Sequence, residues 1–122
     1  MIYESVRAVI ATTEVEALVD DIAPTLLDRG ASIPAITFEV PRTDAAEEVR
    51  GDAEGWMHTV EISCHAYTVD KAEEVALEVV AAIDKSNLML VNSIDRTWSD
   101  SFDENVVIRT HTINALYRKG MS

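Results

Sequence analysis

An alternating segment that leads directly into an amphipathic one constrains the fold of this chain more than any other feature. Residues 56–68 alternate with the two-residue period of a half-buried strand. One side of that strand carries Trp56, His58, Val60, Ile62, Cys64 and Ala66. Residues 69–85 then repeat apolar side chains at helical spacing, namely Ala72, Val75, Ala76, Val79, Val80 and Ile83. We therefore predict a long strand followed at once by a helix, with Asp70 as the N-cap and Glu73 three residues later.

The N-terminal part of the chain carries a second helical pattern. Apolar side chains recur at helical spacing over residues 2–22, with a break at Thr12 and Thr13, either of which can cap the second piece. We expect one helix, kinked at this break, that ends before Pro24. A short extended piece over residues 24–27 should follow.

Three further segments complete a sheet. Residues 34–40 alternate in polarity, and strands are also predicted at 88–98 and 104–119, separated by a turn-rich stretch at 99–103. Strands in runs with few helices favour an α+β fold, with a mainly antiparallel sheet and two helices packed on one face. A chain of 122 residues fits a single domain. Strands as long as those over 56–68 and 104–119 tend to project beyond their own core.

The segment 41–55 stands apart from the rest. It loses the apolar periodicity and collects five acidic residues, two arginines and two glycines. We predict a long loop here, and loops of this length in a small domain usually serve a function.

The charge of the chain excludes some functions. The formal net charge is −12, which disfavours nucleic-acid binding because it repels phosphate. The segments 1–40, 41–55, 56–85 and 86–104 are each net negative, whereas residues 105–122 carry a net charge of +3. The single cysteine cannot form an internal disulfide, the N-terminus has no signal-peptide pattern, and the longest apolar run is five residues, far below the ~20 of a membrane span. We expect a soluble intracellular product without a membrane partner.

The titratable residues do not combine into a site of known chemistry. His58 and His65 are seven residues apart in one strand and so face opposite sides, which makes a zinc site with His111 geometrically poor. Cys64 lies among the apolar positions of its strand and is expected to be a buried hydrophobe. The four glycines form no phosphate-binding loop and no nucleophile elbow. We predict no enzymatic activity, no catalytic residue, no cofactor and no metal.

The order of these segments resembles a known family. An N-terminal amphipathic helix is followed by Ile22-Ala23-Pro24, by the strand around Pro34–Phe38 and by a variable loop. The strand WMHTVEISCHAYT then runs directly into the helix VDKAEEVALEVVAAI, and the chain closes on the strand VVIRTHTINALYRK. This layout is similar to the tail completion, or head-to-tail joining, proteins of long-tailed bacterial and archaeal viruses. The matching aromatic turn and small or apolar helix positions are Tyr67, Ala72, Ala76, Val80 and Ile83.

The resemblance implies a structural protein of the virion neck, assembled in the host cytoplasm. Such proteins form a homo-oligomeric ring, usually of six subunits, that completes the tail tube at the head connector. The implied partners are further copies of the chain, the tail tube protein, and the head connector or adaptor protein. DNA would pass through the ring without specific binding, and an acidic bore would keep it from sticking.

The charged residues of two segments are the candidate contacts to neighbouring subunits or to the bore. The loop supplies Arg42, Asp44, Glu47, Glu48, Arg50, Asp52 and Glu54. The positive C-terminal strand supplies Arg109, Arg118 and Lys119. Removing residues 43–54 is accordingly expected to spare folding and to impair assembly.

Other interpretations of the sequence stay open at this point. The chain could be a binding module that captures a peptide by strand addition at an open sheet edge, or a small enzyme whose site cannot be read from sequence. The excess of acidic residues and the low lysine content, with seven arginines to three lysines, also resemble proteins of salt-loving organisms. We hold a halophilic archaeal host as a hypothesis, because salt would screen the self-repulsion.

Overall fold

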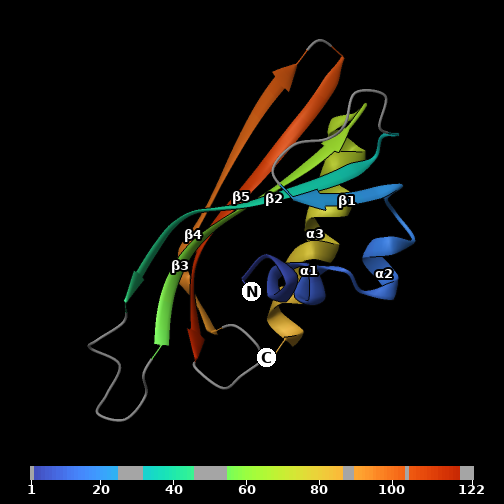
Figure 1. Ribbon diagram of the computed structural model, residues 1–122. Helices are drawn as coiled ribbons and strands as arrows, with labels where there is room; N and C mark the ends of the chain where they lie inside the picture. The colour runs from blue at the N-terminus through green and yellow to red at the C-terminus, as the bar shows by residue number, and fades with distance from the viewer. Residues whose placement is uncertain (1, 25–31, 46–54, 87–89, 104, 119–122) are drawn as a thin grey trace.

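The computed structural model describes residues 2–24, 32–45, 55–86, 90–103 and 105–118 (Figure 1). Its elements follow in the order α1 (Ile2–Ile10), α2 (Thr13–Glu16), β1 (Asp21–Pro24), β2 (Ala35–Ala45), β3 (Gly55–Ala66), α3 (Val69–Lys85), β4 (Leu90–Asp103) and β5 (Val106–Arg118).

The described residues form one five-stranded sheet in the order β1-β2-β3-β5-β4. The short strand β1 pairs in parallel with β2, and all other neighbours are antiparallel. The helices lie on one face of this sheet (Figure 1). The predicted α+β class, with a mainly antiparallel sheet, is confirmed.

The core lies between the central strands and the helices α1 and α3. The register places Phe38 beside Ile62 and Val60 beside Ile113, and all four side chains are buried. The helices close this layer with Val6, Val9, Ile10, Val75, Val79 and Ile83. The apolar faces that the sequence predicted for the strands and for the helices therefore pack against each other in one core.

Helix α3 has the predicted bounds, but its cap differs. Thr68, not Asp70, is the N-cap, because its backbone is extended and its Oγ1 accepts a hydrogen bond from the Lys71 N–H at 3.1 Å. Asp70 is already inside the first turn, where its negative charge favours the helix dipole. The predicted break at the other end of the chain is confirmed, since Thr12 caps α2 by accepting from the Val15 N–H at 3.2 Å.

The predicted extent of the N-terminal helix is wrong. Helix α2 ends at Glu16, and Asp21–Pro24 form β1, where we expected helix up to Pro24. Ile22 is buried in either case, but it reaches the core by pairing with Ile36 of β2. Backbone pairing with a distant strand overrides helical spacing that is only a few residues long. Of the predicted extended piece at 24–27, only its first residue is described.

The predicted loop at 41–55 is too long at both ends. Strand β2 continues to Ala45, beyond a register shift between Glu39 and Arg42, and Ala45 pairs with Trp56. Gly55 already belongs to β3. The remaining loop residues, 46–54, lie outside the described part. In Figure 1 this far end of β2 and β3 extends away from the helices.

The predicted turn at 99–103 is also wrong. These residues continue β4, and they pair with β5 from Ser99 to Asp103. The polar and turn-forming residue types fit an exposed edge strand, where side chains need not enter a core. Asn105 lies in the turn that joins β4 to β5, and β5 begins at Val106.

Candidate functional site

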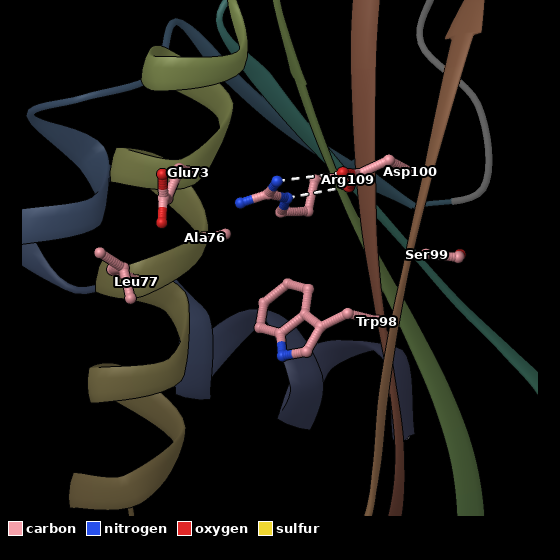
Figure 2. Close-up of a pocket in the computed structure, with 7 residues that line it drawn as sticks. All are labelled: Glu73, Ala76, Leu77, Trp98, Ser99, Asp100 and Arg109. Atoms are coloured by element: carbon pink, nitrogen blue, oxygen red, sulfur yellow. Dashed lines mark hydrogen bonds and ion pairs between the residues drawn. The ribbon is translucent and has the colours of Figure 1, made fainter.

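A groove separates α3 from the edge strand β4. It has a volume of about 340 Å³. Its lining residues, which define the α3–β4 groove below, are Glu73, Ala76, Leu77, Trp98, Ser99, Asp100 and Arg109. Figure 2 shows α3 on one side, with the Trp98 and Arg109 side chains extending from the sheet toward it.

The helical spacing of α3 and the alternation of β4 and β5 bring these side chains to the groove. Glu73, Ala76 and Leu77 are three and four residues apart and so share one face of α3. Trp98 and Asp100 share the helix side of β4, because they stand opposite His111 and Arg109 of β5 in the register.

An ion pair fixes the floor of the groove. Arg109 donates from Nε to Oδ1 of Asp100 at 2.8 Å and from Nη2 to Oδ2 at 3.0 Å (Figure 2). These hydrogen bonds hold the pKa of Asp100 below its ordinary value and raise the pKa of Arg109. The bidentate geometry orients both side chains, although such an exposed pair adds little stability. Arg109, a predicted contact to a neighbouring subunit, thus binds a carboxylate of its own chain.

Two large apolar side chains on the walls of the groove are open to solvent. The Leu77 side chain is 62% exposed and that of Trp98 45% exposed. The Trp98 ring packs on the buried His111 ring, with 3.9 Å between centroids and 31° between planes. A rigid aromatic surface beside a fixed ion pair is suited to binding another surface, since aromatic residues supply much contact area at little entropic cost.

The described residues offer little for catalysis. Burial raises the pKa of the Cys64 thiol to about 12, so it is a buried hydrophobe, as predicted, and no ready nucleophile. Within the described ranges no group of three or more His, Cys, Asp or Glu is placed to hold a metal ion. Nor does any helix in the described part have the length and hydropathy to cross a membrane.

The histidines lie apart, as the sequence predicted. His58 is buried on the helix side of β3, whereas His65 points to the opposite face. There a hydrogen bond of 2.9 Å joins Nε2 of His65 to Oγ1 of Thr37. Burial lowers the pKa of both imidazoles, because it disfavours the charged form.

These lowered pKa values predict a loss of stability in mild acid. As the pH falls, the unfolded chain binds a proton at His65 near the ordinary histidine pKa of about 6.5, before the folded chain does. The stabilisation is thus complete above about pH 6.5 and is lost as the pH falls through the folded pKa. We expect the free energy of unfolding to fall between about pH 7.5 and 5.5, and to fall less in His65→Gln. Urea denaturation at both pH values measures this, and an equal fall in both proteins would contradict it.

Most of the predicted contact residues cannot be placed as side chains. Arg42 and Asp44 lie in β2 and Arg118 ends β5, of which only the backbone is described. The predicted candidates outside the described residues are Glu47, Glu48, Arg50, Asp52, Glu54 and Lys119. A second hollow of about 300 Å³ lies beside α1, α2 and β1 and is lined by Arg7, Ala11, Glu16, Val19, Asp20, Asp21 and Ile22.

Sequence reasoning missed the α3–β4 groove. One signal was present, because Leu77 is a large apolar residue outside the buried stripe of its helix. Trp98 gave a second signal once its strand was placed at the sheet edge. Neither position identifies a groove until the register sets β4 beside β5 and α3 over the sheet.

Comparison with known proteins identifies the family. The sequence model of the family described as "Tail completion protein gp17" matches residues 6–114, which is most of the chain. The chain belongs to this family. As a tail completion protein it is a structural component of the virion, located in the tail or neck, which confirms the predicted resemblance and location.

The fold of this tail completion protein also occurs in a solved virion. A chain of the structure titled "Virion of native gene transfer agent (GTA) particle" superposes with a TM-score of 0.60 at 14% sequence identity. The match covers 97% of this chain and 92% of that one, so the whole fold is shared. No curated protein matches the sequence.

Proposed function

We propose that this tail completion protein forms a ring that closes the tail tube and joins it to the head connector. The observation that carries the proposal is the length of β3, β4 and β5, which span 12, 14 and 13 residues. Strands in globular proteins usually have about 5–6 residues. The described core lies between the central strands and the helices, and we propose that the outer parts of these strands reach neighbouring subunits.

Six subunits are the number that the family resemblance implies for this ring. Its partners would be copies of the chain, the tail tube protein, and the head connector or an adaptor. The charged residues of segment 41–55 remain candidates for the bore or for subunit contacts. With a net charge of −12, the ring would repel DNA phosphates and let the genome pass without specific binding. We propose no catalytic step for it.

Solution mass and electron microscopy test this proposal. We expect the purified chain to form a closed oligomer with a mass that is a multiple of 13.5 kDa, and virions to carry it as a ring at the neck. A strict monomer at high concentration that is also absent from virions would overturn the proposal.

A second candidate function rests on the sheet edge. Strand β4 ends the sheet of the described residues, and its outer backbone edge faces no other strand there. A peptide could add to this edge by backbone hydrogen bonds. A monomeric chain that shows new strand-edge protection from amide exchange on adding a tail or head protein would favour this function over the ring.

The acidic composition leads to a prediction on salt. Raising KCl from about 0.1 M to about 1 M shortens the Debye length from about 10 Å to about 3 Å. Because the chain carries −12, screening should relieve self-repulsion and raise Tm by roughly 5 °C. Thermal unfolding followed by circular dichroism measures the change. A constant Tm over this range would count against adaptation to a salt-loving host.

A further inference from the structure

The α3–β4 groove carries large apolar side chains that the described part of the chain leaves exposed. Leu77 lies on its helix wall and Trp98 on its strand wall. Phe102, which is 69% exposed, follows Trp98 on the same side of β4, since the register places it opposite Val107. Phe102 lies beyond the groove on this side of β4, whereas Leu77 and Trp98 line it. Exposed apolar side chains that line a groove can mark an interaction surface.

The charge of the groove sets the chemistry of its occupant. Asp100 and Arg109 neutralise each other, so the net charge of the lining residues is that of Glu73, which is negative. An occupant that matches this groove therefore combines an apolar or aromatic group with positive charge.

The chain itself contains such a segment. The segment 117–119 supplies one aromatic ring, Tyr117, and two cations, Arg118 and Lys119, and it lies within residues 105–122, which carry a net charge of +3. Two copies that each carry −12 repel one another, so a contact between copies is favoured where this segment meets a negative surface.

The segment cannot occupy the groove of its own chain. Strand β5 runs from Val106 to Arg118 without leaving the sheet, and Tyr117 lies eight residues beyond Arg109. At ~3.4 Å per residue the two positions are roughly 27 Å apart along the strand. Residues 117–119 can therefore reach this groove only from another copy of the chain.

We propose that the α3–β4 groove binds residues 117–119 of a neighbouring copy of this chain. The inference rests on the ring proposed above and names one of its subunit contacts. Because the groove and the segment are different surfaces of one molecule, the contact is heterologous. A heterologous contact repeats around an axis and generates a closed ring when the rotation closes, which an isologous dimer contact does not.

Cysteine cross-linking between two variants tests the contact. Cys64 is buried and burial raises its thiol pKa to about 12, so we expect it to react far more slowly than an exposed cysteine. Leu77→Cys in one preparation and Gly120→Cys in another leave Tyr117, Arg118 and Lys119 intact. We expect a disulfide-linked dimer when the two are mixed under mild oxidation, and none from either alone.

The controls separate this contact from its alternatives. Asp20→Cys places a thiol at the second, acidic hollow, and it should not cross-link to Gly120→Cys. A product with Asp20→Cys only, or a Leu77→Cys homodimer, would overturn the proposal. If the wild-type chain forms rings and the Leu77→Cys mixture stays uncross-linked, the groove is wrong and the ring stands. A wild-type chain that is monomeric at high concentration and absent from virions would overturn both.

Charge exchange gives an independent readout. Glu73→Lys should weaken self-association about tenfold or more, because it sets like charges together. Reversing both cations of the segment, by combining Glu73→Lys with Arg118→Glu and Lys119→Glu, should restore much of the loss. Glu14→Lys on α2 makes the same change of charge away from the groove and should have little effect. Sedimentation velocity measures all four proteins, and equal weakening by Glu14→Lys would contradict a specific contact.

Discussion

Replacing Phe38 by Ala is expected to reduce the free energy of unfolding by about 3–5 kcal/mol. The Phe38 side chain is 2% exposed and stands beside Ile62 in the centre of the core. The substitution removes buried apolar surface and leaves a cavity that the surrounding strands and helices cannot fill. A loss of this size is a large share of the stability of a small domain.

The chain provides its own control for this experiment. Phe102→Ala is the same substitution at a side chain that is 69% exposed, and it should change the free energy of unfolding by no more than about 0.5 kcal/mol. Urea denaturation of both variants, at a concentration where the protein is monomeric, measures the difference. Similar losses in the two variants would contradict the assignment of the core.

Replacing residues 46–54 by a flexible linker of the same length is expected to impair ring assembly and leave folding intact. The register shows that β2 and β3 are already paired from Ala45 and Trp56 inward. The described core draws on residues outside this segment, so the free energy of unfolding should change by less than about 0.5 kcal/mol. The cut begins after Ala45, because Thr43, Asp44 and Ala45 belong to the paired strand.

Two measurements decide this prediction. Denaturation in urea reports on folding, and sedimentation together with electron microscopy reports on assembly. Loss of cooperative unfolding would show that the segment is part of the core. Unchanged ring formation would show that the segment makes no subunit contact, and the charged candidates within it would then be withdrawn.

Local sequence patterns predicted the features that depend on residues close together in the chain. Helix α3 has its predicted bounds because apolar residues recur at helical spacing over all seventeen of its residues, a pattern that no strand would produce. Its cap moved from Asp70 to Thr68 because both residue types cap helices, and only the backbone conformation decides between them. The burial of Cys64 and the separation of His58 from His65 followed from the alternation of one strand.

Pairing between distant segments decided the rest. Residues 21–24 became a strand because Ile22 lies beside Ile36, and residues 99–103 became a strand because β5 holds their backbone. Neither segment has a strong local preference, so the long-range partner determines its conformation. The same holds for Arg109, whose local sequence gives no indication that Asp100, nine residues earlier, would bind it.

The sequence by itself determined the fold class, the family and the acidic character, because these depend on periodicity, order and composition. The tertiary structure decided the α3–β4 groove. Its walls come from α3 and β4, which meet there only because β5 inserts between β3 and β4 and sets β4 at the edge. Local sequence cannot predict such a surface, because its residues come together only when the strand order and the register of the whole sheet are set.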